Sequence, residues 1–111
     1  GNLNQAPVVL SVNPNYSPLQ VEYGGIQNIS LQVKDVEGDT THYSISTPNG
    51  AVSIINGSLT NSTNLKNGIA YISFTYIAPA SGVDTSFDIT VTLNDGPNFV
   101  TKTIPVFVYN F

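Results

Sequence analysis

Apolar and polar residues alternate with a period of two along most of this chain. The clearest example is the run SFDITVTL at 86–93, whose apolar residues share one phase: Phe87, Ile89, Val91 and Leu93. Successive side chains of a β-strand point to opposite faces of the sheet, whereas a helix repeats its apolar face about every 3.6 residues. This period predicts strands with one buried face, and we expect a fold built from β-strands without helices.

Shorter runs repeat the alternation and are separated by turn sequences. The runs that carry an apolar stripe are ISLQVK at 29–34, AVSII at 51–55, AYISFTYIA at 70–78 and VTKTIPVFVY at 100–109. Their stripes place Ile54 and Phe74, together with Phe87, in the core. Turn residues interrupt the runs about every 8 to 12 residues, a spacing typical of antiparallel sandwiches with Greek-key connections. We predict an all-β sandwich of about seven antiparallel strands.

The length of 111 residues suits one domain with a single core. We expect residues 1–6 to form an N-terminal linker and residues 7–111 to form the sandwich. Cysteine, methionine and tryptophan are absent from the chain. Its stability must therefore come from packing rather than from disulfides.

The few charged side chains argue against several classes of partner. Three lysines and no arginine stand against seven acidic residues, which disfavours binding to nucleic acid or to anionic membranes. No apolar run approaches the roughly 20 residues of a membrane-spanning helix, so we expect no membrane insertion by this chain. Asn, Ser and Thr take the place of charged residues, as is common in secreted proteins. We expect an extracellular or cell-surface location.

The sequence contains few residues that could form a catalytic site. His42 is the only histidine and no cysteine accompanies it, so a zinc site is not expected. Serines and threonines are numerous, but none has a candidate base or lies in a nucleophile elbow. We therefore predict that the chain is not an enzyme and has neither catalytic nor cofactor-binding residues.

Five short motifs occur in an order that is informative as a set. They are NQAPVV at 4–9, LQVKDVEGDTTHYSI at 31–45, GAVSI at 50–54, FTYIAP at 74–79 and SFDITVTLNDG at 86–96. Together they resemble the cadherin-like and immunoglobulin-like modules that bacteria carry in tandem on surface proteins and adhesins. The resemblance implies an immunoglobulin-like (cadherin-like) Greek-key β-sandwich and neighbouring domains of the same polypeptide as partners. In many such modules calcium is held between neighbouring domains.

The acidic segment KDVEGD at 34–39 is the candidate metal site. By the resemblance, Asp35, Glu37 and Asp39 match the acidic residues of these modules. Calcium takes about six to eight oxygen ligands, so three carboxylates supply at most half of a site. The linker also has the neutral pair Asn4-Gln5 where acidic residues are common, which weakens the other half. The alternative reading of this segment is an ordinary polar turn.

Five aromatic residues fall outside the predicted core phase: Tyr16, Tyr23, Phe99, Phe107 and Tyr109. Exposed aromatic rings can stack against sugars or anchor a partner protein. The alternative is partial burial under loops or against a neighbouring domain.

Two functions are compatible with these features. The first is a non-catalytic structural or adhesive module of a secreted or cell-surface protein, expected to be bacterial, with an interdomain calcium half-site and a protein or glycan ligand. The second is a carbohydrate-binding module appended to a secreted hydrolase.

Overall fold

The computed structural model describes residues 7–34, 42–56, 69–94 and 98–111. These residues form eight strands: β1 (Val8–Asn13), β2 (Leu19–Glu22), β3 (Ile26–Lys34), β4 (His42–Ser46), β5 (Ala51–Asn56), β6 (Ile69–Ile77), β7 (Thr85–Asn94) and β8 (Phe99–Tyr109). Within these four ranges there is no helix, in agreement with the period-two pattern. The described residues accordingly offer no helix with the length and hydropathy to span a membrane.

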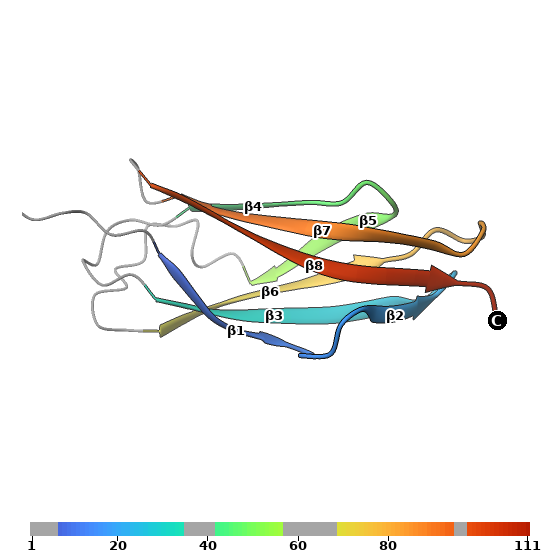
Figure 1. The fold of residues 1–111 in the computed structure, drawn as a ribbon, viewed down its shortest axis with the longest axis horizontal. Helices are drawn as coiled ribbons and strands as arrows, with labels where there is room; N and C mark the ends of the chain where they lie inside the picture. Colours follow the sequence, from blue (N-terminus) through green and yellow to red (C-terminus); the bar gives the residue numbers. More distant parts are fainter. Residues whose placement is uncertain (1–6, 35–41, 57–68, 95–97) are drawn as a thin grey trace, which may run out of the picture.

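The strands form two four-stranded sheets that pack face to face (Figure 1). One sheet has the order β1-β3-β6-β5 and the other has the order β2-β8-β7-β4. Neighbouring strands are antiparallel except β2 and β8, which run parallel over residues 19–22 and 106–109. The predicted β-sandwich is confirmed.

The described residues contain eight strands, rather than about seven, because the first strand is divided between the two sheets. β1 pairs with β3 at the edge of one sheet, and β2 pairs with β8 at the edge of the other. The sequence NPNYSP at 13–18 separates them, and its two prolines cannot donate to a strand ladder. The chain therefore leaves the first sheet at this point and continues on the second, where it lies parallel to β8.

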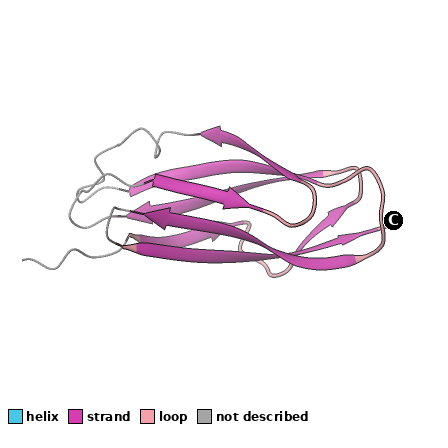
Figure 2. Ribbon diagram, turned by 90° about the horizontal axis from the view of Figure 1, so that it is seen from above, coloured by secondary structure: helices cyan, strands magenta, loops and turns pink. Residues whose placement is uncertain are grey.

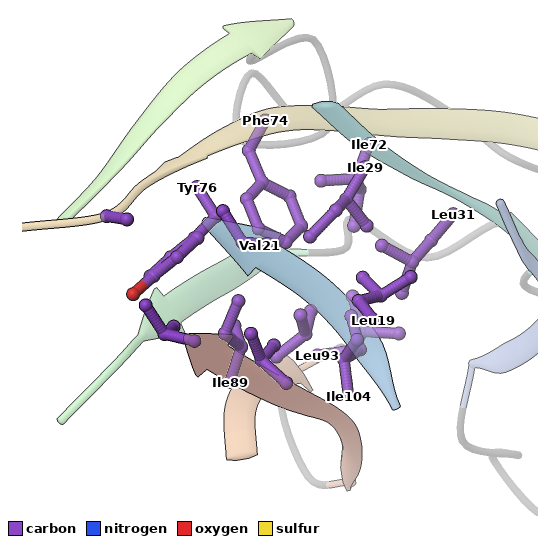
Figure 3. Close-up of a cluster of buried hydrophobic side chains, with 14 of the residues drawn as sticks. Leu19, Val21, Ile29, Leu31, Ile72, Phe74, Tyr76, Ile89, Leu93 and Ile104 are labelled. Atoms are coloured by element: carbon purple, nitrogen blue, oxygen red, sulfur yellow. The ribbon is translucent and has the colours of Figure 1, made fainter. Parts of the chain in front are cut away.

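The inner faces of the two sheets meet in one apolar core (Figure 3). Phe74 and Tyr76 are its largest fully buried side chains. The other buried residues are Leu19, Val21, Ile29, Leu31, Val33, Ile72, Ala78, Ile89, Val91, Leu93, Ile104, Val106 and Val108. Each large apolar side chain buried in this way stabilises the fold by about 1.5–3 kcal/mol before entropy costs. The stripes predicted on β3, β6, β7 and β8 supply most of this core.

Two residues predicted in the core are less buried than expected. Phe87 is only partly buried, although its ring packs against Tyr76 with ring centroids 5.7 Å apart. Ile54 has the inward phase opposite Phe74, yet 47% of its surface is exposed. It lies on the edge strand β5, where the pairing with β6 shifts between Ile54 and Asn56. The prediction for Ile54 is wrong because the periodicity of a strand does not reveal that it lies at a sheet edge.

The described chain enters and leaves the sandwich at opposite ends (Figures 1 and 2). At one end Val8, the first residue of β1, pairs with Lys34, the last residue of β3. At the other end the Tyr23 N–H, just before β3, donates to the Tyr109 carbonyl at 3.0 Å. Strands of this length, such as the 11 residues of β8, span about 36 Å. The two ends of the domain are thus separated by the full length of its strands.

Candidate functional site

The predicted calcium residues Asp35, Glu37 and Asp39 lie outside the described residues. The flanking strands show where the segment begins and ends: β3 finishes at Lys34 and β4 starts at His42, both at the end of the sandwich where β1 begins. Among described residues, no group of three or more His, Asp or Glu side chains is placed to hold a metal ion. Calcium binding by residues 35–39 therefore stays a prediction.

The acidic and histidine side chains that the structure describes lie apart from one another. The Asp84 carboxylate accepts a hydrogen bond from the Asn110 N–H at 2.8 Å, so it fastens the C-terminal segment to the turn before β7. Asp88 lies opposite Pro105 in the sheet, and His42 lies opposite Asn94 on exposed β4. In the described part of the chain, no nucleophile with a neighbouring base emerges from these groups.

Burial explains the two tyrosines whose ionisation is perturbed. Desolvation raises the pKa of Tyr43, which packs against the core from β4. Desolvation also raises the pKa of Tyr76, and the charge of a neighbouring Tyr23 anion raises it further. The Tyr76 hydroxyl donates to Asn49 Oδ1 at 3.4 Å. Both phenols stay protonated well above neutral pH and belong to the core rather than to a reactive site.

Three of the five aromatic residues predicted outside the core phase are partly covered. Tyr23 packs against the core, and its hydroxyl donates to the Val83 carbonyl in the turn before β7. Phe107 and Tyr109 stack on each other, with ring centroids 6.1 Å apart and planes 13° from parallel. The partial-burial reading is therefore correct for Tyr23, while Phe107 and Tyr109 are half-buried with one ring face of each turned toward the other.

Tyr16 is exposed and lines a groove at the crossing between the two sheets. The groove has a volume of about 310 Å³ and lies between β1, the segment 14–17 and residues 102–105 of β8. Lys102 is the charged residue among those that line it. The fifth aromatic residue, Phe99, lies at the start of β8 with 66% of its surface exposed.

A broader polar surface covers the centre of the outer face of the sheet β1-β3-β6-β5, between the exposed apolar pair Ile26 and Ile77 at one end and Val8 at the other. We name it the Tyr71 face and define it by the outward residues Ser11, Asn13, Asn28, Ser30, Gln32, Ser53, Tyr71, Ser73 and Thr75. The strand pairing arranges them in rows, because Ser11 pairs with Gln32 and Gln32 with Tyr71. The next rows contain Ser30 beside Ser73 and Asn28 beside Thr75.

Hydrogen bonds connect these side chains across the strands. Ser11 Oγ donates to Gln32 Oε1 at 2.9 Å, and Gln32 Nε2 donates to the Tyr71 hydroxyl oxygen at 3.1 Å. Thr75 Oγ1 donates to Asn28 Oδ1 at 2.7 Å. Tyr71 is 49% exposed despite this anchoring. The face thus combines a held aromatic ring with amide and hydroxyl groups directed toward solvent.

A shallow depression crosses the Tyr71 face. It has a volume of about 230 Å³ and is lined by Asn13, Asn28, Ile29, Ser30 and Ser73. The row formed by Ser30 and Ser73 lies below its neighbours because serine side chains are short. The rows on either side carry longer side chains. Chemically this surface can bind a ligand through hydrogen bonds and ring contacts, without charge.

Sequence reasoning missed Tyr71 as a binding candidate. Its phase on β6 is opposite to that of Ile72, Phe74 and Tyr76, so its outward direction was available from the alternation. The residues beside it could not be predicted in this way. Gln32 is 39 residues away in the chain, and Ser11 comes near only because β1 pairs with β3. Knowledge of the strand order is needed to bring these three residues together.

Comparison with known proteins gives one relative by sequence. No protein-family model matches the chain. The chain is 35% identical over 92 residues to Chitinase A of Pseudoalteromonas piscicida, a match that covers 82% of this chain and 10% of that protein. The chain therefore spans about a tenth of the length of the curated relative that it matches.

Several solved structures with the same architecture come from bacterial surface proteins. The BIgI domain of the beta protein from S. agalactiae, solved bound to CEACAM1, has a TM-score of 0.60 at 16% identity, over 95% of this chain and 98% of that one. The SrpA adhesin from Streptococcus sanguinis has a TM-score of 0.60 at 14% identity, over 96% and 59%. Domains 4 and 5 of the S-layer protein SbsC give 0.51 at 19% identity, over 93% and 53%.

These likenesses establish the fold of the domain. The chain has an immunoglobulin-like sandwich of the kind found in bacterial adhesin and S-layer proteins, and this part of the resemblance in its motifs is confirmed. The specific cadherin-like features, including calcium between domains, stay predictions.

Proposed function

We propose that this immunoglobulin-like domain is a non-catalytic module of a larger extracellular or cell-surface protein, in which it separates the domains on either side. The observation that carries this proposal is that the described chain enters at one end of the sandwich and leaves at the other. A domain of this shape adds about the length of its strands, roughly 36 Å, to the distance between its neighbours. Its closest partners are then the adjacent domains of the same polypeptide.

Several observations support an extracellular setting, expected to be bacterial. The chain has no cysteine and few charged residues, and its fold is shared with adhesin and S-layer domains. Calcium held jointly by residues 35–39 and the preceding domain would restrict the angle between the two domains. The proposal includes a protein ligand bound on an exposed face of the sandwich.

Small-angle X-ray scattering on two copies of this chain joined head to tail tests the spacing role. We expect an extended particle whose maximum dimension is close to twice that of one copy, because the junction lies at the ends of both sandwiches. A single copy measured under the same conditions is the reference. A two-copy particle that folds back, with a maximum dimension near that of one copy, would refute the proposal.

Carbohydrate binding is the second candidate function, favoured by the relative named Chitinase A. A module of a chitin-degrading enzyme can hold that enzyme on its insoluble substrate without catalysing the reaction. Sedimentation of this chain with insoluble chitin tests the idea directly. Depletion from the supernatant that saturates with protein concentration supports it, and full recovery in the supernatant contradicts it.

A further inference from the structure

We infer that the Tyr71 face is the surface through which this domain binds a neutral polysaccharide, with the Tyr71 ring against a sugar ring and the surrounding amides and hydroxyls on its polar edges. The inference rests on the second proposed function, carbohydrate binding, and assigns it to particular residues.

The Tyr71 face carries almost no charge. Among the described outward residues of β1, β3, β5 and β6, Lys34 at one end is the only charged side chain. The centre of the face carries serine, threonine, asparagine and glutamine hydrogen-bonding groups. A charged ligand would leave its charge without a counterion on such a surface, whereas a neutral ligand rich in hydroxyls leaves nothing unpaired. The face therefore selects against anionic polymers.

Tyr71 is exposed, and hydrogen bonds fix its orientation. An exposed aromatic ring offers a flat apolar surface that suits the C–H groups of a pyranose ring. Gln32 Nε2 holds the Tyr71 oxygen at 3.1 Å, and Ser11 fixes the orientation of the Gln32 amide from the other side. Because the ring is held before a ligand arrives, less side-chain freedom is lost on binding. The phenol still has its own proton to donate to a sugar oxygen.

The shape of the Tyr71 face also suits a sugar ring. The depression beside Ser30 and Ser73 is bordered by Asn28, whose Oδ1 already accepts from Thr75. The Asn28 amide nitrogen therefore keeps both of its hydrogens for a ligand. At about 230 Å³ the depression is smaller than the roughly 300–1,000 Å³ of a site that encloses a drug-sized ligand. It suits one ring of a chain that continues across the open face.

The other exposed features are less suitable for this ligand. Phe107 and Tyr109 each have one ring face turned toward the other ring. The groove near Tyr16 contains Lys102, whose charge a neutral sugar does not compensate. Phe99 is exposed opposite Asn94, with Thr101 next in its phase, but a phenylalanine has no hydroxyl through which neighbouring side chains could hold its ring. It therefore serves as a matched control, being an exposed aromatic residue on the opposite sheet.

Binding of four proteins to insoluble chitin and to insoluble cellulose tests the assignment. These are the wild-type chain and the variants Tyr71→Ala, Tyr71→Phe and Phe99→Ala, with thermal unfolding of each to confirm that it is folded. We expect Tyr71→Ala to weaken binding about three- to tenfold, as expected for one aromatic contact. Phe99→Ala should stay within about twofold of the wild type. Tyr71→Phe keeps the ring but loses the Gln32 hydrogen bond and the phenol proton, so its affinity should fall between those of the wild type and Tyr71→Ala. Binding to anionic alginate should be at least about tenfold weaker.

The outcomes separate this inference from the proposed functions. A wild-type chain that binds neither polysaccharide overturns both the inference and the carbohydrate-binding role, and it leaves the spacing role intact. Binding that Tyr71→Ala does not change overturns only the assignment to this face. Equal binding of alginate overturns the neutral class of ligand.

A second variant reports binding without depending on loss of affinity. The chain contains no tryptophan, so Tyr71→Trp introduces a single indole at the centre of the face. We expect soluble chitin oligosaccharides to shift its emission to shorter wavelength in a saturable manner, because a sugar ring covers the indole. Phe99→Trp should give no shift. An unchanged spectrum for Tyr71→Trp, under conditions where the wild type binds, overturns the assignment.

Discussion

The phase of a residue along its strand decides whether it stabilises the sandwich or faces solvent. On β6, Phe74 and Tyr76 lie in the core, while Tyr71 and Thr75, in the other phase, belong to the Tyr71 face. Substitutions only a few positions apart should therefore affect different properties. Inward changes should lower stability, and outward changes should alter binding.

Phe74 should be among the most costly residues to truncate. Its side chain is fully buried, so Phe74→Ala should lower the free energy of unfolding by about 3–5 kcal/mol, through lost transfer energy and a cavity. Phe87→Ala should cost about half as much, because Phe87 is only partly buried. Urea denaturation measures both. Tyr71→Ala is the outward control, expected to cost about 1 kcal/mol or less. A loss below about 1 kcal/mol for Phe74→Ala would contradict its place in the core.

Alkaline pH should destabilise the domain through Tyr76. Burial raises its pKa in the folded state above the value of about 10 for an unfolded tyrosine. The stability linked to the neutral phenol is therefore complete below about pH 10 and is lost as pH rises through the folded-state pKa. Denaturation measured between pH 8 and 11 should show the fall, and Tyr76→Phe should reduce its slope. Tyr16→Phe, which removes an exposed hydroxyl, is the control. An equal slope in Tyr76→Phe and wild type would exclude Tyr76 as the source.

At the scale of strands, the sheet edges distinguish regions that look alike in sequence. β8 pairs with β7 along its whole length, but β2 covers its other side only over residues 106–109. Within the described chain no strand pairs with that side of residues 99–105. Lys102 lies opposite the buried Val91, in the inward phase, yet it is exposed. An inward-pointing lysine and Pro105 are features that prevent another strand from adding to an open edge.

Removal of the lysine charge should allow this edge to self-associate. Lys102→Val restores a continuous apolar stripe from Val100 to Ile104 while the backbone of the edge stays open. We expect concentration-dependent dimers in sedimentation velocity at about 100 µM, where the wild type stays monomeric. Thr101→Val, on the outward face of the same strand, is the matched control. A Lys102→Val protein that is monomeric at the same concentration would show that the lysine does not protect the edge.

The alternation of residues was sufficient to predict the elements that form the centre of each sheet. Val33, Phe74, Val91 and Val106 lie in long stripes, and all four are buried as expected. These strands have neighbours on both sides or a long antiparallel partner, so the local pattern and the tertiary environment agree. The immunoglobulin-like fold followed from the same stripes together with the order of the motifs.

Features that depend on strand order could not be predicted in this way. Ile54 has the inward phase but lies at an edge, and Tyr23 is out of phase but packs against the core from a turn. Tyr71 and Gln32 become neighbours only once β3 pairs with β6. Contacts between residues far apart in sequence are set by topology, which period-two patterns do not specify.

At the scale of the whole molecule, the direction of the chain through the sandwich links fold to function. β1 begins, β3 ends and β4 begins at the end where the chain enters. Residues 35–41 connect the end of β3 to the start of β4, and both of these strand ends lie at the entry end. In the proposed multidomain protein, a preceding domain would approach this end of the sandwich, and a following domain would attach beyond Tyr109 at the other. Any ion shared with the preceding domain has to use residues from the entry end.

Calcium affinity should therefore depend on the presence of the preceding domain. Asp35, Glu37 and Asp39 supply three carboxylates, fewer than the roughly six to eight oxygens that calcium requires, and Asn4 and Gln5 add no charge. Calorimetry on the isolated chain should show no uptake at micromolar calcium, with affinity on the order of 1 mM or weaker. A longer protein that includes the preceding domain should bind more tightly, because that domain contributes the missing oxygens.

The decisive measurement compares two double variants of that longer protein. Asp35→Asn with Glu37→Gln should remove the gain in calcium affinity, since it deletes two ligands at the shared site. Glu22→Gln with Asp88→Asn also deletes two carboxylates, but Glu22 pairs with Tyr109 at the exit end and Asp88 lies opposite Pro105, away from the entry end, so this control should keep the gain. If both double variants keep the affinity of the wild type, residues 35–39 form a polar turn and the interdomain calcium site is wrong. If both lose it equally, the effect comes from net charge rather than from coordination.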